Sequence, residues 1–436
     1  MLRLLTLLCA ALCFTGCLEE TCNESRIVIG FEPVTTSAGE WRSNSSFFCG
    51  VGQPICTASG FYVYQDYLLV VEENKGLHIY DNSNPANPTP ITFMEAPGGQ
   101  GLAVRNDILY LNQYTDLVAF SLADPTKPEL VGRTTDVFEP YSVFAQVLPD
   151  GDFVVDWVES GERRTLTCQD PNFRNAWFAE GDVRFASGRA TLFNNLSSTS
   201  ADFANSGAGG GEVVGQGGSL ARFTINQGTL YAVDESRLKV FDLTDAANPV
   251  YADQVNLGWG IETIFPYEDK LFVGARNGMH IYSVATPTAP EHLSTFEHVL
   301  NCDPVVVHDD KAYVTLWGGR DCGSTGDQLE IIDVSDARNP VSLEVTPMTN
   351  SHGLAVADGK LFLCAQWEGL KVFDLRSNGL LGDELDHQAD INARDVIALP
   401  RQNNLIVLGY ADDGIQQYRY ADDGQLSPLS HLNLCD

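Results

Sequence analysis

The stretch "GLHIYDNSNPANP", residues 76–88, is an alternating apolar run that ends in a cluster of Asp, Asn, Ser and Pro. Alternation with a period of two is typical of a β-strand, and the polar cluster is typical of a turn. Similar stretches are "RLKVFDLTDAANP" (237–249), "LEIIDVSDARNP" (329–340) and "GLKVFDL" (369–375). The chain therefore contains an internal repeat.

Each repeat unit holds four short alternating or apolar runs. A tight Asp, Gly or Asn turn joins the first run to the second, and a charged or Gly-bearing link joins the second run to the third. An Asp-x-Ser/Thr-Asp-x-x-x-Pro link precedes the fourth run, where side chains satisfy local backbone groups. Clear units begin at Phe61, Leu102, Phe223, Ile264, Val305, Leu354 and Val396, and a degenerate eighth unit occupies residues 140–217.

Four antiparallel strands with a period of about 41 residues form one blade of a β-propeller. A single blade cannot bury both of its faces, so neighbouring blades must stack and the ring must close. We therefore predict an all-β propeller of four-stranded antiparallel blades. The eight units predict eight blades, or seven if the degenerate unit is excluded. A β-sandwich is the alternative fold, whereas no helical windows support an α/β fold.

The composition restricts the partners of the chain. Its 436 residues include 58 acidic and 26 basic side chains, which give a formal net charge of −32. Such a surface repels phosphate backbones and therefore argues against nucleic-acid binding. A hydrophobic content of 44% is ample for a folded core.

The N-terminal residues have the pattern of an export signal. Arg3 precedes the short apolar run "LLTLLCAALCF", and "TGC" follows that run. The end of the segment resembles the lipobox of bacterial lipoproteins, although Phe14 replaces the usual Leu. The resemblance implies cleavage before Cys17, lipidation of Cys17 and, because Leu18 follows, sorting to the outer membrane. The alternative is an ordinary secretory signal.

The repeat units resemble the LVIVD repeats of bacterial β-propeller lipoproteins. "GLKVFDL", "LEIIDVSDARNP" and "LHIYDNSNPANP" carry this resemblance, which covers residues 59–434 apart from a poorly matching 160–216. The family is largely uncharacterised. The resemblance therefore implies the fold and the location but not the activity.

These features predict three parts of the chain. Residues 1–16 are a lipoprotein signal peptide, and residues 17–58 are a lipidated tether followed by a segment that packs on the ring. Residues 59–434 are the propeller, with an insertion around 160–216. From 186 to 218 the chain is rich in Ser, Asn, Ala and Gly, which predicts a long, mobile loop.

Eight cysteines remain in the chain after Cys9, Cys13 and Cys17, and an even number in an exported protein favours disulfides. We expect Cys302 to pair with Cys322, because both fall on one face of the same blade. A small loop closed by Cys49 and Cys56 is a second expected pair. The sequence leaves open the pairing of the other four: Cys22, Cys168, Cys364 and Cys435.

One face of the propeller brings together the starts of the first strands. Alignment of the units places one equivalent residue at each channel entrance: Ser59, Gln100, one of residues 139–141, Ala221, Glu262, Asp303, His352 and Arg394. Among these, Glu262, Asp303 and His352 are plausible ligands of a metal or members of a catalytic centre. The alternative is a water-filled channel lined by ordinary polar groups.

Aromatic residues gather on the same predicted face. The links between second and third strands carry Trp157, Trp317 and Trp367, and Trp259 precedes a first strand. With Tyr114 and Arg276 beside them, these rings could bind sugars or peptides. The alternative is that they pack between blades or cover the rim.

Other signals are weaker. Two "YADDG" segments, at 410–414 and 420–424, could bind calcium through their carboxylates, although the pattern favours turns. Neither G-x-S-x-G nor H-E-x-x-H occurs in the chain.

The sequence leaves three functions open. The first is a lipid-anchored, non-catalytic module of the cell envelope that binds a glycan or an envelope protein. The second is a metal-dependent hydrolase or lyase centred on the channel. The third is a purely structural envelope component.

Overall fold

The computed structural model describes residues 25–43, 49–50, 53–56, 58–72, 75–142, 145–167, 184–185, 214–234, 236–297, 304–317, 326–410 and 413–433. The chain divides into two compact units. The larger comprises Thr36–Phe153 with Ser197–Asp436, and the smaller comprises Met1–Thr35 with Val154–Leu196.

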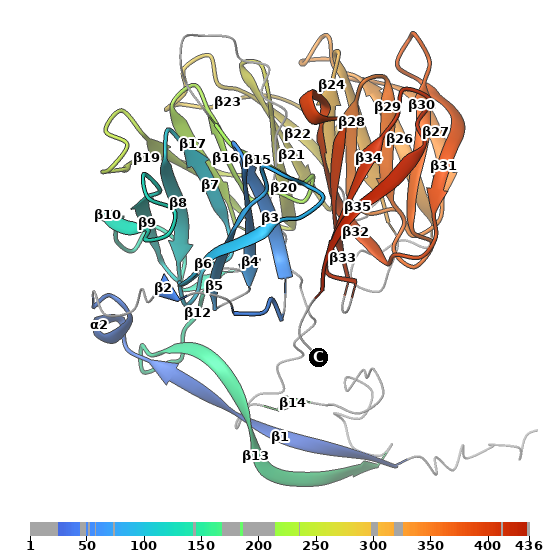
Figure 1. The fold of residues 1–436 in the computed structure, drawn as a ribbon. Coiled ribbons are helices and arrows are strands. Elements are labelled where there is room, and N and C mark those ends of the chain that lie inside the picture. The colour runs from blue at the N-terminus through green and yellow to red at the C-terminus, as the bar shows by residue number, and fades with distance from the viewer. Residues whose placement is uncertain are drawn as a thin grey trace, which may run out of the picture. The chain divides into compact units, whose positions relative to one another are not determined.

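The larger unit is a β-propeller (Figure 1). Within the described residues, seven sheets have four consecutive antiparallel strands in the order of a blade. From the innermost strand outwards they are β3 (Ala58–Tyr64), β4 (Tyr67–Glu72), β5 (Gly76–Asp81) and β6 (Thr89–Glu95) in blade 1; β7 (Leu102–Arg105), β8 (Ile108–Gln113), β9 (Asp116–Ser121) and β10 (Glu129–Thr134) in blade 2; β16 (Phe223–Asn226), β17 (Thr229–Val233), β18 (Arg237–Asp242) and β19 (Val250–Asn256) in blade 3; β20 (Ile261–Tyr267), β21 (Lys270–Ala275), β22 (Gly278–Ser283) and β23 (Glu291–Glu297) in blade 4; β24 (Val305–His308), β25 (Lys311–Leu316), β26 (Asp327–Asp333) and β27 (Val341–Met348) in blade 5; β28 (Leu354–Ala357), β29 (Lys360–Cys364), β30 (Leu370–Leu375) and β31 (Leu381–Gln388) in blade 6; and β32 (Ala393–Leu399), β33 (Asn404–Gly409), β34 (Ile415–Tyr420) and β35 (Leu426–Leu432) in blade 7.

The predicted all-β propeller is confirmed, and within the described residues the structure shows seven blades, the second of the two counts left open. The degenerate unit supplies no such four-stranded sheet among the described residues. Its β11 (Tyr141–Ser142) and β12 (Ala145–Gln146) pair only with each other. The long β13 (Phe153–Thr167) forms a separate sheet with β1 (Ser25–Thr36) and β14 (Arg184–Phe185).

Local chemistry ends the strands where the repeat predicts. Turns between first and second strands place a residue in the left-handed region, for example Gln65 with φ 53° and Asp358 with φ 49°. Between third and fourth strands, an Asp carboxylate accepts a backbone hydrogen bond two residues on. Thr244 N donates to Asp242 Oδ1 at 2.7 Å. These bonds replace the strand pairing that stops at the turn.

The apolar cores lie between neighbouring blades and continue around the ring. The core between the last and first blades includes Phe61 and Val70 with Ile397 and Ile406, and β33 contacts β3. Asn82 and Gln417 also exchange two side-chain hydrogen bonds, of 3.1 and 2.6 Å. Each blade is a continuous stretch of chain, so side-chain packing and hydrogen bonds close the ring.

The two-residue strand β2 (Cys49–Gly50) adds to the outer edge of blade 1 by pairing with β6. Among the described residues, no helix has the length and apolar character needed to cross a membrane.

Candidate functional site

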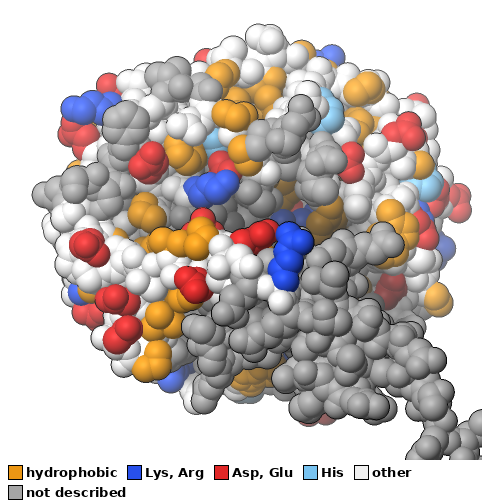
Figure 2. All heavy atoms as spheres, turned by 90° about the horizontal axis from the view of Figure 1, so that it is seen from below, with side chains coloured by type: hydrophobic (Ala, Val, Ile, Leu, Met, Phe, Trp, Pro, Cys, Tyr) orange, Lys and Arg blue, Asp and Glu red, His pale blue; other side chains and the backbone are white. Residues whose placement is uncertain are grey.

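The entrance face is the side of the ring where innermost strands begin and where second strands join third strands. Figure 2 shows the molecule from the side on which α2 (Ala38–Trp41) lies in Figure 1. Asp303 lies outside the described residues. Six aligned residues lie in or just before an innermost strand: Ser59, Gln100, Ala221, Glu262, His352 and Arg394.

The middle of the ring is occupied by residues 214–222, named here the channel segment. Val214 forms a β-bridge with Arg105 of blade 2. Directly after it, β15 (Gln216–Gly217) pairs with β3, the innermost strand of blade 1. The predicted loop of residues 186–218 therefore ends in buried β-structure, and its last residues correct that prediction.

The same segment reaches the far side of the ring. Ser219 N and Oγ each donate to Asp395 Oδ1 of blade 7 at 3.0 Å, and Leu354 N of blade 6 donates to Ser219 Oγ at 2.8 Å. Arg222 Nη1 donates to the carbonyl of Ile261 in blade 4 at 3.2 Å. At this level, backbone and buried side chains of the channel segment occupy the centre of the ring.

Glycines allow this close approach. A Cβ atom on Gly215 would lie 2.2 Å from the Tyr62 ring, and one on Gly218 would lie 1.9 Å from Asp395 Oδ2. At distances this short, a larger residue would force the Tyr62 ring, the Asp395 carboxyl group or the backbone to shift. The glycine-rich "GQGG" of residues 215–218 is therefore a packing requirement of the ring centre.

Asp395 is the titratable group at this centre. Oδ1 accepts three hydrogen bonds of 3.0 Å, two from Ser219 and one from Val396 N, whereas Oδ2 has none in the described part of the chain. Burial raises the pKa of Asp395 to about 7, although the Arg394 guanidinium and the hydrogen bonds oppose the shift. Burial also raises the pKa of the neighbouring Cys364 thiol. Oδ2 therefore fits a protonated hydroxyl near neutral pH.

His352 lies among aromatic rings at the entrance. Its ring centroid is 4.3 Å from Trp317 and 5.9 Å from Tyr410, and the Arg394 guanidinium carbon lies 5.5 Å from the Tyr410 ring. Burial and the charge of Arg394 lower the pKa of His352 to about 3. The imidazole is therefore neutral in the physiological range, and a proton on it is disfavoured.

The proposed ligand set does not assemble in the described residues. These residues hold no group of three His, Cys, Asp or Glu that could bind a metal ion. Glu262 instead forms an ion pair, in which Arg276 Nε lies 3.3 Å from its Oε1. His352 faces the cation of Arg394, which disfavours a second cation there.

Glu262 belongs to a small cluster on the rim with Trp259 and Arg276. The Arg276 guanidinium carbon lies 5.1 Å from the Trp259 ring centroid, and the Trp259 side chain is 72% exposed. Burial raises the pKa of Glu262, while the charges of Arg222 and Arg276 oppose that rise. We call Trp259, Arg276 and Glu262 the rim cluster.

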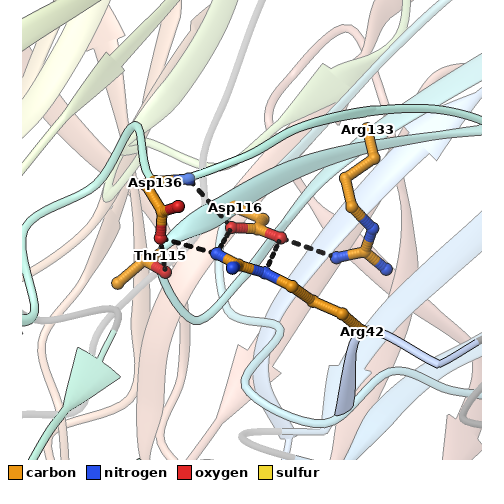
Figure 3. Close-up of polar contacts among 5 residues, drawn as sticks. All are labelled: Arg42, Thr115, Asp116, Arg133 and Asp136. Atoms are coloured by element: carbon orange, nitrogen blue, oxygen red, sulfur yellow. Dashed lines mark hydrogen bonds and ion pairs between the residues drawn. The ribbon is translucent and has the colours of Figure 1, made fainter. Parts of the chain in front are cut away.

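The segment before the propeller also packs on the entrance face. Trp41 of α2 is buried, and its ring centroid lies 5.2 Å from that of Tyr114. Arg42 donates to both carboxylate oxygens of Asp116, at 2.9 and 2.6 Å (Figure 3). Arg133 contacts the same carboxylate at 2.9 Å from the other side. Asp116 has no exposed side-chain surface, so these contacts hold residues 37–43 firmly on blade 2.

The repeat seen in sequence and structure matches a known family. A family model described as LVIVD repeat matches residues 57–92, which cover β3, β4, β5 and part of β6. The chain therefore contains an LVIVD repeat and folds as a β-propeller. No curated protein matches it in sequence.

Solved structures share the fold of this LVIVD propeller. A putative 6-phosphogluconolactonase from Bacteroides fragilis NCTC 9343 is similar over 90% of this chain and 98% of its own, with a TM-score of 0.53 and 11% identity. The periplasmic gluconolactonase of Pseudomonas aeruginosa is similar over 86% and 96%, with a TM-score of 0.53 and 9% identity. A protein from Lactobacillus plantarum matches over 86% and 97%, with a TM-score of 0.53 and 13% identity. At these identities the likeness shows the fold alone.

The aromatic residues of the LVIVD propeller divide into exposed and buried groups. Trp259 and Trp367 are 72% and 66% exposed, whereas Trp317 is partly buried against His352. Tyr114 is 2% exposed, so its expected role in ligand binding is wrong, because Trp41 covers it. Trp157 lies in β13 of the smaller unit, and its side chain is outside the described residues.

The structure contradicts one of the two expected disulfides. Cys49 has a free thiol, so the Cys49–Cys56 disulfide is wrong. Cys49 lies at the outer edge of blade 1 opposite Met94, whereas Cys56 is disulfide-bonded to a residue outside the described ones. Cys17, Cys302 and Cys322 also lie outside the described residues.

The second "YADDG" segment is a turn between β34 and β35. Gly424 N donates to the carbonyl of Ala421 at 2.9 Å, and Gln425 N donates to Asp423 Oδ1 at 3.2 Å. Part of the first segment, residues 411–412, lies outside the described residues. Calcium binding there stays a prediction.

Proposed function

We propose that this LVIVD propeller is a non-catalytic binding module of the cell envelope, anchored by lipid on Cys17, and that its entrance face binds a glycan. The observation that carries the proposal is the exposure of Trp259 and Trp367, at 72% and 66%, on that face. An exposed indole ring is large, flat and amphipathic, and it can therefore contact a ligand from the surface. Flat indole rings stack on the C–H faces of sugars while their N–H groups reach hydroxyls.

The packing of the ring centre favours ligand binding at the rim and disfavours a catalytic site in the channel. The channel segment fills the middle of the ring with Gly218 and Ser219 packed against Asp395. His352 is neutral and buried, with its pKa lowered to about 3. A general acid or base works best with a pKa near the working pH and with access to substrate. These groups therefore favour a structural role at the centre.

Lactone hydrolysis is the second candidate, because two of the structural neighbours are described as gluconolactonases. Glu262 is the group that would serve as general acid or base, since burial raises its pKa and it reaches the rim. A pH-indicator assay with glucono-1,5-lactone tests this candidate. Hydrolysis by the wild type that is lost in Glu262→Gln would replace the binding proposal.

Glycan-array binding of the purified propeller tests the first candidate. Trp259→Ala and Trp367→Ala should each weaken binding of any glycan found. Tyr251→Ala is the matched control, because Tyr251 is an exposed aromatic residue on the outer strand β19. If the two tryptophan variants bind the glycan as the wild type does, the entrance face is not the binding site. If an envelope protein is captured instead and needs the same residues, the ligand class is wrong.

Lipid attachment has its own test. Cells expressing the full chain should incorporate an alkynyl fatty acid into the protein, and Cys17→Ser should abolish the label. The label should fractionate with the outer membrane. A secreted, unlabelled wild-type protein would contradict the anchor without affecting the glycan site.

A further inference from the structure

The backbone around Trp259 is shaped to present the ring to solvent. Gly258 and Gly260 both lie in the left-handed region, with φ 97° and 87°, a conformation that glycine adopts without steric cost. A Cβ atom on Gly260 would lie 3.1 Å from Cγ and Cδ of Arg276. The second glycine therefore also makes room for the arginine stem. The two glycines allow this path of the backbone, and the arginine packs beside the exposed indole.

Arg276 is held through one nitrogen of its guanidinium group, Nε. Its Nε contacts Glu262 Oε1 at 3.3 Å, and its backbone N donates to Gly260 O at 3.0 Å. In the described part of the chain its two Nη groups make no hydrogen bond or ion pair. The Arg276 side chain is 26% exposed. Donors of a planar, fixed fork thus remain available beside the Trp259 ring.

The charge and the donors of the rim cluster indicate the chemistry of its ligand. A guanidinium fork matches the two oxygens of a carboxylate, and Arg222 adds a second positive charge near Glu262. The chain as a whole has a net charge of −32, whereas here two arginines lie near a single carboxylate. Glu262 can bond a hydroxyl, and the indole can cover an apolar sugar face.

We propose that the rim cluster is a subsite for a carboxylate-bearing sugar unit, with Arg276 on the carboxylate, Trp259 on the sugar ring and Glu262 on a hydroxyl. This inference rests on the proposed glycan-binding function and adds the class of sugar. Neutral sugars would engage Trp259 but leave the Arg276 fork without an anion. Selectivity for the acid therefore depends on Arg276, whereas affinity for any sugar depends on Trp259.

Calorimetric titration with an oligogalacturonate and with its methyl ester tests the inference, because the two probes differ in charge but share the sugar chain. The wild type should bind the acid roughly tenfold or more tightly than the ester. Arg276→Gln should remove that preference by weakening binding of the acid more than binding of the ester. Trp259→Ala should weaken both. Arg338→Gln is the matched control, since Arg338 pairs with Glu291 in an exposed ion pair.

The possible outcomes distinguish failure of the carboxylate assignment from failure of the proposed glycan-binding function. Equal binding of acid and ester, still dependent on Trp259, would overturn the carboxylate assignment and leave the glycan site in place. Tighter binding of a sulfated oligosaccharide than of the oligogalacturonate would overturn it as well. Binding of no glycan would overturn both proposals. A preference for the acid that persists in Arg276→Gln would show that another group reads the carboxylate.

Discussion

The ring centre and the rim cluster each contain a carboxyl group whose pKa is raised by burial, yet the two have different partners. Among the described residues, Asp395 lies against Gly218 and accepts its hydrogen bonds from the backbone and from Ser219. Glu262 pairs with Arg276, whose guanidinium group lies beside the exposed Trp259 ring. A raised pKa therefore marks burial in both places, and the surrounding side chains show which carboxyl group can meet a ligand.

The largest effect is expected at the ring centre. Gly218→Val should destabilise the propeller by about 3 kcal/mol, because the new side chain overlaps the Asp395 carboxyl group. Urea unfolding measures the change. Gly326→Ala is the control, since a Cβ at Gly326 has no atom within 4 Å. A stable Gly218→Val variant would mean that the channel segment is loosely held.

The pH dependence of stability tests Asp395 directly. Its pKa of about 7 in the folded chain exceeds the ordinary value of 3.8, so the folded state holds the extra proton between these pH values. The free energy of unfolding should fall as pH rises from about 4 through about 7, by an amount on the order of 4 kcal/mol. Asp395→Asn mimics the protonated acid and should remove this part of the dependence. Parallel curves for wild type and variant would contradict the assignment.

The contact between Arg42 and Asp116 tests whether charged residues on the entrance face stabilise the fold. Arg42→Ala should cost about 2 kcal/mol, because it removes two hydrogen bonds from a buried carboxylate that retains Arg133. It should also expose the chain near residue 41 to proteases. Arg338→Ala, which breaks an exposed pair, should cost less than about 0.5 kcal/mol. Equal losses of unfolding free energy in the two variants would show that burial of Asp116 does not strengthen its ion pair with Arg42.

The smallest change in stability is expected at the ligand face. Trp259→Ala should alter the free energy of unfolding by less than about 0.5 kcal/mol, since the side chain is 72% exposed. Thermal unfolding measures it beside the sugar titration. A loss above about 1 kcal/mol would assign Trp259 to packing and remove it from the binding face.

Much of the architecture was predictable because it repeats. The turn chemistry at residues such as Asp242 and Asp358 marks the ends of strands, and alignment of the units placed Glu262 and His352 at the entrance. The rim cluster was only partly predictable. Trp259 and Arg276 stood out by position, but their contact and the free donors of Arg276 depend on the path of the backbone at Gly260.

Other features had no periodic signal. The glycine-rich residues 215–218 have the composition of a mobile loop, yet they fill the ring centre because five other blades offer partners there. Tyr114 occupies a link like those of the exposed tryptophans, but Trp41 from outside the repeat covers it. Asp395 follows the aligned Arg394 by one residue, and that adjacency was the available signal.

The order of apolar and turn residues alone determined the blade, its four strands and the face on which their ends meet, because these depend on contacts close in sequence. Tertiary structure decided the number of blades in the ring, the filling of its centre and the division of aromatic rings between core and surface. Those outcomes depend on contacts between distant segments, such as Ser219 with Asp395 and Trp41 with Tyr114. No local pattern encodes which distant partner a side chain will meet.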